Sequence, residues 1–192
     1  MLIAWSRCSI LSSGAIGKRK RVSDATAVLI TGASGFVGSA VARTLIQAGF
    51  PVRALVRQAS PRFHLDGLDL KFITGDLRDT DSVRRAMNGS RYVFHVAADY
   101  RLWARDPGAI YAANVDGTRN VMQEALRAGV ERVVYTSSVA TLGWPYHGAP
   151  GDETIPLSEA EGIGTYKRSK IAAERLVEQD LQSVANTLRP LA

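Results

Sequence analysis

A tyrosine and a lysine four residues apart, Tyr166 and Lys170, form the pattern in this sequence that most directly suggests chemistry. On a helix, residues i and i+4 share one face, so the Lys170 ammonium would stand beside the Tyr166 phenol and favour its ionised form. A tyrosine that ionises more readily can exchange a proton with a hydroxyl or carbonyl group of a substrate. Because Tyr-x-x-x-Lys is also a common surface pair, it indicates a catalytic site only in the company of other parts of one.

Two adjacent serines, Ser137 and Ser138, directly follow the apolar run 132–136. Ligands of parallel α/β sheets bind at the carboxyl ends of the strands, so a serine there could hydrogen-bond the same substrate oxygen as Tyr166. Chemistry alone does not separate the two serines.

Three regularly spaced glycines, Gly32, Gly35 and Gly38, lie between the apolar run 27–31 and a segment with helical periodicity. The first glycine permits a tight turn, the second lets the backbone approach a diphosphate, and the third lets the helix pack closely on the strand. Free N–H groups and the helix dipole would then face the diphosphate, with the Ser34 hydroxyl as a further donor. A glycine-rich turn without a ligand is the alternative, and the flanking strand and helix make it the weaker one.

Apolar runs alternate with segments of helical periodicity along the chain. We expect strands at 27–31, 51–56, 70–74, 92–97 and 132–136, and the start of a sixth at 184–188; we expect helices at 36–46, 79–87, 110–128 and 165–179, and a loop at 143–156. Such alternation indicates βαβ units with right-handed crossovers. The predicted fold class is α/β, a Rossmann-type doubly wound parallel sheet.

The Gly-x-x-Gly-x-x-Gly spacing after Thr31 resembles that of the extended short-chain dehydrogenases/reductases, the NAD-dependent epimerase/dehydratase family. The resemblance covers about 27–190, and the runs 152–154 and 164–170 are most similar to hopanoid-associated sugar epimerase-like and dihydroflavonol-reductase-like proteins. It implies catalytic roles for Ser138, Tyr166 and Lys170, favours Ser138 over Ser137, and lets Lys170 reach the nicotinamide ribose. The residues expected to bind the cofactor are Gly32, Ser34, Gly35, Phe36, Val37, Gly38, Arg57, Asp76, Leu77, Ala97, Ala98, Tyr166 and Lys170.

The choice of cofactor depends on the end of the predicted strand 51–56, which has no acidic residue to hold the ribose 2′-hydroxyl of NAD. A guanidinium can grip a 2′-phosphate, so Arg57, with Arg53 second, favours NADP over NAD; two surface arginines are the alternative. By resemblance, Asp76 contacts the adenine amino group and Leu77 lines its pocket, although Asp76 could instead cap the next helix.

Other candidates have plainer interpretations. Small residues at Ala97-Ala98 let the backbone lie against the cofactor, and Asn114 resembles a structural residue of the family. His95 is expected to be a packed core histidine, and His147 an exposed loop residue. Tyr100 and Trp103 follow a strand at the ligand edge, where stacking on a substrate ring and ordinary loop packing are equally open.

Taken together, these patterns predict hydride transfer between a nicotinamide and an alcohol or carbonyl of a small molecule, of the sugar-nucleotide or hydroxy-ketone type. By resemblance, longer relatives are expected to form homodimers. The alternative is a non-catalytic NAD(P)-binding module or an inactive fragment, because family members continue well beyond the segment at 188–190, in a C-terminal substrate domain that we expect to be missing here.

Charge and composition indicate which other kinds of function the sequence does not support. Residues 1–24 hold five Lys or Arg against one Asp, a charge of +4 out of +6, which leaves +2 for residues 25–192. We expect a disordered basic leader at 1–24 and an NAD(P)-binding domain, incomplete at its C-terminus, at 25–192. Lys18–Arg21 alone is poor support for nucleic-acid binding. With Cys8 as the single cysteine and no apolar run of spanning length, we expect no metal site, no membrane partner and a cytoplasmic location.

Overall fold

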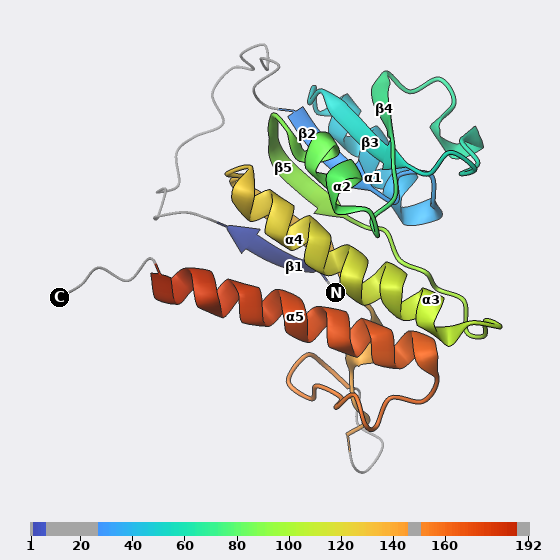
Figure 1. Ribbon diagram of the computed structural model, residues 1–192, viewed down its shortest axis with the longest axis vertical. Coiled ribbons are helices and arrows are strands. Elements are labelled where there is room, and N and C mark those ends of the chain that lie inside the picture. The colour runs from blue at the N-terminus through green and yellow to red at the C-terminus, as the bar shows by residue number, and fades with distance from the viewer. Residues whose placement is uncertain (1, 7–26, 146–150, 188–192) are drawn as a thin grey trace.

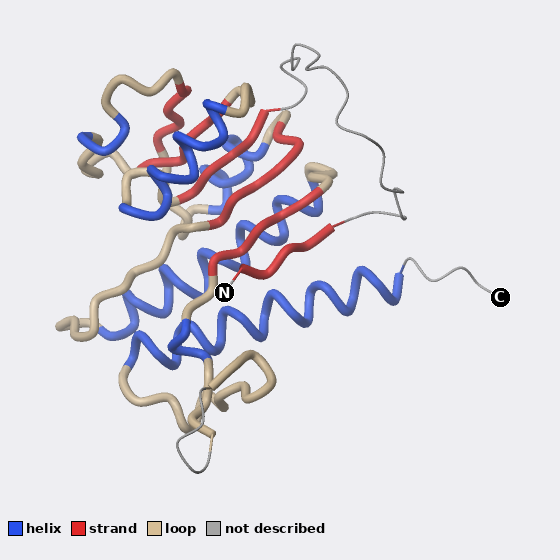
Figure 2. Tube along the Cα trace, turned by 180° about the vertical axis from the view of Figure 1, so that it is seen from behind, coloured by secondary structure: helices blue, strands red, loops and turns tan. Residues whose placement is uncertain are grey.

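The computed structural model describes residues 2–6, 27–145 and 151–187, which contain a six-stranded sheet of order β1-β6-β5-β2-β3-β4 (Figure 1). Strands β2 to β6 are parallel, and β1 pairs antiparallel with β6 at one edge (Figure 2). The bounds of the strands are Leu2–Ser6 for β1, Ala27–Thr31 for β2, Val52–Val56 for β3, Leu70–Thr74 for β4, Ser90–His95 for β5 and Arg132–Thr136 for β6. The strand order reverses beside β2, so the glycine turn that follows β2 lies at the switch point where doubly wound sheets bind ligands.

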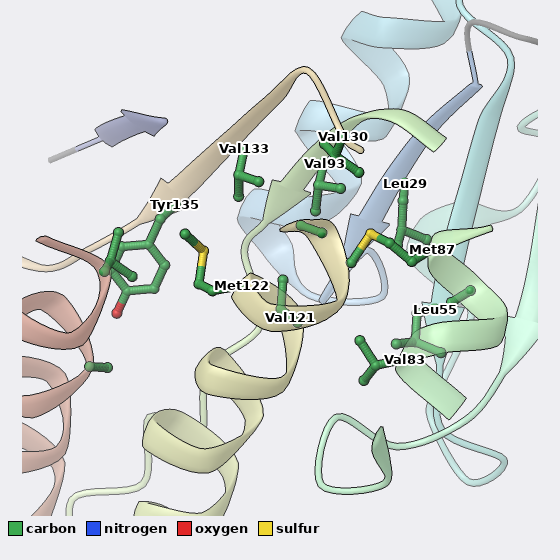
Figure 3. Packing of buried hydrophobic residues seen from close by; sticks show 14 residues of the cluster. Leu29, Leu55, Val83, Met87, Val93, Val121, Met122, Val130, Val133 and Tyr135 are labelled. Carbon is green, nitrogen blue, oxygen red and sulfur yellow. The ribbon is translucent and has the colours of Figure 1, made fainter. Parts of the chain in front are cut away.

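Helices cover both faces of this sheet. They are α1 (Phe36–Gln47), α2 (Thr80–Met87), α3 (Pro107–Tyr111), a π-helical turn (Ala112–Asp116), α4 (Gly117–Arg127) and α5 (Thr165–Thr187), with 3₁₀ turns at Phe63–Leu65 and Val139–Thr141. Residues of α2, α4 and α5 share one hydrophobic core with the sheet (Figure 3), whereas α1 and the first 3₁₀ turn pack on the other face. Continuous apolar strands such as β2, buried along its whole length, follow from this two-sided coverage.

The C-terminal strand expected at 184–188 is not present among the described residues, because α5 continues through Thr187. Residues 165–187 contain neither glycine nor proline, so nothing in the sequence stops the helix at 179, where we expected its end. Leu188 lies outside the described residues.

The prediction of disorder for the whole leader also differs from the structure at Leu2–Ser6. These residues form β1, which pairs with β6 from Leu2 opposite Thr136 to Ser6 opposite Arg132. No sixth parallel strand lies beside β6 among the described residues, and β1 instead pairs with the backbone groups along this edge of β6. Residues 7–24 lie outside the described part of the chain. None of the helices among the described residues combines the length and apolar content that a membrane span requires.

Candidate cofactor pocket and catalytic residues

The turn between β2 and α1 is built so tightly that two of its three glycines are required by geometry. Gly32 adopts a φ of +73°, and a Cβ there would come within 2.6 Å of the Ala97 backbone. A Cβ on Gly38 would lie only 2.1 Å from the Gly32 carbonyl oxygen. Gly35 differs, because its Cβ would meet only that same oxygen, at 3.4 Å, and Gly35 lines a pocket. Gly32 and Gly38 therefore shape the turn, and Gly35 leaves room for a ligand.

The first turn of α1 presents the positive end of the helix dipole to this pocket. Gly35 is its N-cap residue, without a side-chain cap, and the first turn holds no acidic residue. Backbone N–H groups at such a helix terminus bind phosphate oxygens well.

The pocket has a volume of about 750 Å³, in the range of small-molecule and cofactor sites. Eleven of the residues expected from the sequence line it: Gly32, Ser34, Gly35, Phe36, Val37, Gly38, Arg57, Asp76, Leu77, Ala97 and Ala98. Tyr166, Lys170 and Ser138 are not among its lining residues. Segments from the ends of β2, β3, β4 and β5 thus meet around one space, as the sequence predicts for the carboxyl edge of the sheet.

Two arginine–aspartate pairs that the sequence analysis did not predict line the pocket. Arg78 donates to both carboxylate oxygens of Asp76, at 3.0 and 2.7 Å, and this pairing, aided by the charge of Arg57, lowers the pKa of Asp76. Asp99 is paired in the same way with Arg101. All five residues line the pocket. Three arginines against two aspartates leave one positive charge, carried by Arg57.

Two alternatives left open by the sequence are resolved by these contacts. The N-cap of α2 is Asp79, which accepts from the Asp81 N–H, so Asp76 does not cap that helix. Arg53, the second candidate for a 2′-phosphate, is absent from the pocket lining and donates to Ser90 Oγ at 2.5 Å. Arg57 is therefore the arginine at the end of β3 that faces the pocket.

The two serines after β6 have different partners. The Tyr166 hydroxyl donates to Ser138 Oγ at 3.4 Å, and Ser138 Oγ also accepts from the Ala140 N–H. The Ser137 hydroxyl instead donates to Glu174 Oε2. The structure thus brings Ser138, rather than Ser137, to the predicted proton-transfer residue.

Lys170 lies on the same helix as Tyr166 but is bonded elsewhere. Its Nζ donates to Tyr135 Oη at 2.8 Å and to the Thr136 carbonyl at 3.0 Å, so its hydrogen bonds go to β6. The sequence predicted only that its charge would stand beside the Tyr166 phenol. The residue is 3% exposed, and burial lowers the pKa of Lys170 to about 8, against an opposing effect of Glu174. The periodicity of α5 placed this side chain on the correct helix face without revealing its partner, since Tyr135 is remote in sequence.

His95 is the packed core histidine expected from the sequence, and its neighbours assign its protons. The Thr118 hydroxyl donates to the Asn114 carbonyl at 2.6 Å, so its oxygen accepts from His95 Nε2 at 2.9 Å. His95 Nδ1 then accepts from the Thr31 hydroxyl at 2.6 Å, whose oxygen accepts from the Ala97 N–H. Burial first, and the charge of Lys170 second, lower the pKa of His95 to about 3, so the ring is neutral.

Asn114 connects the pocket to the helix that carries Tyr166. Its amide binds both backbone groups of Asp99, at 2.6 and 2.9 Å, and donates to Ser169 Oγ at 2.9 Å. Ser169 in turn donates to the Tyr166 carbonyl. Asn114 is thus placed as a structural residue, in line with its expected role.

The aromatic candidates near the pocket divide by position. Tyr100 is 78% exposed and lines the pocket, whereas Trp103 is 77% exposed and does not. His147 lies outside the described residues.

The sequence and the fold are both similar to those of known proteins. The profile of the NAD-dependent epimerase/dehydratase family matches residues 28–186. A Synechocystis protein, whose name marks it as a proposed dihydroflavonol 4-reductase, is 45% identical over 146 residues, 76% of this chain and 42% of the relative. The crystal structure of the protein called gox2253 is 52% identical with a TM-score of 0.75, over 80% of this chain and 46% of that one. A Thermus thermophilus UDP-glucose 4-epimerase in complex with NAD is 27% identical with a TM-score of 0.72, over 83% of this chain and 52% of that one.

The chain thus spans about half the length of the proteins that it matches. The match extends from the glycine turn through Tyr166 and Lys170. The chain belongs to the NAD-dependent epimerase/dehydratase family and has the extended short-chain dehydrogenase/reductase fold.

Proposed function

We propose that this chain binds NADP(H) in the pocket between the glycine turn and Arg57, and that it supplies the proton-transferring residues of a hydride-transfer site. The proposal rests on one observation: three features surround a single pocket of about 750 Å³. They are the N-terminus of α1, the two glycines that the turn requires, and Arg57, whose charge is left over after the two arginine–aspartate pairs. The open side of Gly35 gives a diphosphate access to the backbone, and Arg57 is placed for a 2′-phosphate. The residues present therefore fit a dinucleotide.

When bound, the dinucleotide supplies or accepts the hydride. The protein residues handle the proton: the Tyr166 hydroxyl, 3.4 Å from Ser138 Oγ, donates to or accepts from a substrate oxygen, and Ser138 offers that oxygen a second hydrogen bond. Lys170, on the same helix as Tyr166, contributes a buried positive charge and donates to Tyr135 Oη. The name of the Synechocystis relative supports a substrate alcohol or carbonyl of the hydroxy-ketone type, and that of the epimerase supports a sugar nucleotide.

Replacing Tyr166 by Phe tests this assignment. We expect Tyr166→Phe to slow hydride transfer about 10³-fold, because it removes the general acid–base group, while NADPH binding stays within about twofold. With a dihydroflavonol, whose reduction consumes NADPH, the rate is followed by NADPH absorbance. With UDP-glucose, whose epimerisation would regenerate NADP⁺, it is followed by the formation of the 4-epimer. Tyr92→Phe, remote from Ser138, is the control and should retain the wild-type rate.

A second candidate function, cofactor binding without catalysis, is favoured by the lining of the pocket, which does not include Ser138, Tyr166 or Lys170. NADPH binding by the unaltered chain with no hydride transfer to or from either probe would establish that candidate instead. Equal rates for wild type and Tyr166→Phe would exclude the proposed role of Tyr166.

The preference for NADP is a separate prediction. We expect Arg57→Asp to weaken NADP⁺ binding about tenfold or more, because a bidentate charge-assisted contact is replaced by a like charge. NAD⁺ binding should be unchanged or tighter. Calorimetric titration of both nucleotides provides the measurement, with Arg43→Asp on the exposed side of α1 as a charge-matched control. Tighter binding of NAD⁺ than NADP⁺ by the wild type would contradict the preference.

A further inference from the structure

Three consecutive residues at the end of β6 are held by two buried charged side chains of α5. Tyr135 and Thr136 accept from the Lys170 ammonium, and Ser137 donates to the Glu174 carboxylate, one helical turn further on. Figure 3 shows Tyr135 pointing from β6 toward this helix. Lys170 is 3% exposed and Glu174 8% exposed. An ammonium and a carboxylate are therefore both withdrawn from water at the same strand–helix contact.

A buried ammonium requires compensation for its lost hydration. The described titratable groups around Lys170 are His95 on β5, Tyr135 on β6, and Tyr166 and Glu174 on α5. The His95 ring is neutral, and burial, followed by the nearby Glu174 carboxylate, raises the pKa of Tyr135, so Tyr135 also stays neutral at pH 7. Among these groups, Glu174 is the one whose charge opposes the effect of burial on Lys170.

We propose that Glu174 is a positioning residue for Lys170: its carboxylate, anchored by Ser137, keeps the buried ammonium charged and bonded against Tyr135 and Thr136. The consequence for catalysis, a fixed positive charge beside the Tyr166–Ser138 pair, rests on the proposed function. The electrostatic role of Glu174 does not, because it is a property of the chain without substrate or cofactor.

A purely structural role for Glu174 makes a different prediction. Gln at position 174 keeps the size of the side chain and an oxygen that accepts from Ser137, but lacks the charge. If Glu174 only clamps the end of β6, Glu174→Gln leaves the titration of Lys170 unchanged. If its charge acts on Lys170, the ammonium loses its proton at lower pH.

The test is an NMR titration of the lysine side chains in the full chain, without cofactor. Lys170 is one of five lysines in the sequence, so its signal is assigned by its absence in Lys170→Arg. We expect Glu174→Gln to lower the titration midpoint of Lys170 by about one pH unit, the usual scale of a nearby buried charge. Glu178→Gln removes the same charge from the exposed face of the same helix and should leave the midpoint in place.

An unchanged midpoint in folded Glu174→Gln would overturn the proposal, as would an equal shift in Glu178→Gln. Should Glu174→Gln fail to fold by circular dichroism, Glu174→Asp carries the test. It keeps the charge at a greater distance from Lys170, so its midpoint should fall by less than one unit but measurably, and a midpoint equal to that of the wild type would again overturn the proposal. Loss of NADPH binding or of turnover does not enter this readout, so failure of the proposed function remains distinguishable.

Discussion

Between pH 7 and pH 5, we expect His95 alone to remove about 2 kcal/mol of the free energy of unfolding. The folded-state pKa of His95 is lowered to about 3 from an ordinary 6.5 by burial and by Lys170. Below pH 6.5, His95 therefore binds a proton in the unfolded chain, whereas in the folded chain it binds one only near pH 3. The stabilisation is complete above pH 6.5 and is lost progressively as the pH falls.

Urea unfolding at pH 7, 6 and 5, followed by circular dichroism, measures this loss. His95→Gln should be less stable at pH 7, because Thr31 and Thr118 lose hydrogen bonds to the ring, but its free energy should fall by about 2 kcal/mol less over the same pH range. His64→Gln removes a histidine outside the core and should keep the wild-type slope. Depressed aspartate pKa values, such as that of Asp76, act mainly below this range. Identical slopes for wild type and His95→Gln would contradict the assignment.

Gly38→Ala should destabilise the chain by about 3 kcal/mol, at the upper end of the cost of overpacking. The added methyl carbon would lie 2.1 Å from the Gly32 carbonyl oxygen and 2.9 Å from the Ala33 Cα. Both are backbone atoms, so no side-chain rotation can relieve the clash. Relief requires α1 to move away from β2, which also opens the hydrophobic core on that face.

For a domain of this size, the loss corresponds to a melting temperature lower by about 10 °C. Gly49→Ala is the control: its φ of +85° makes alanine unfavourable, yet its Cβ would meet nothing within 4 Å. That variant should cost only about 1 kcal/mol. Comparable melting temperatures for the two variants would show that the close contact at Gly38 is not what constrains this turn.

Local sequence patterns predicted much of the fold. The five parallel strands appear where continuous apolar runs end in turn residues, and β2, β4 and β6 have the predicted bounds. The bounds of β3 and β5 differ from the prediction by one or two residues at an end, and the two larger differences concern the edge of the sheet beside β6. Leu2–Ser6 can pair with β6 only where no other strand occupies that edge. Which segment pairs there is decided by the tertiary structure, and the local sequence of neither segment reveals it. The length of α5 could have been anticipated from the absence of glycine and proline up to Thr187.

The site was predictable to the extent that it consists of backbone geometry. The glycine spacing, the residues at the ends of the predicted strands and the family resemblance together predicted eleven residues that line the pocket. The partners of charged side chains were not predictable in the same way. Arg78 follows Asp76 by two residues, a local pairing that sequence could have suggested, whereas the contact of Lys170 with Tyr135 depends on how α5 packs on β6.

The central claim, that the glycine turn binds a dinucleotide, is tested most directly by titrating NADPH into the chain and following nicotinamide fluorescence. Saturable binding of one NADPH per chain, displaced by NADP⁺, is the expected result. Gly35→Val is the matched variant. Gly35 lines the pocket, and a Cβ at this position would meet only the Gly32 carbonyl oxygen, at 3.4 Å, so the added side chain fills the pocket without a backbone clash. It should fold as the wild type does and bind NADPH at least about tenfold more weakly, as expected when a diphosphate loses backbone N–H contacts. Equal affinity of wild type and Gly35→Val, or no saturable binding by the folded wild type, would contradict the claim.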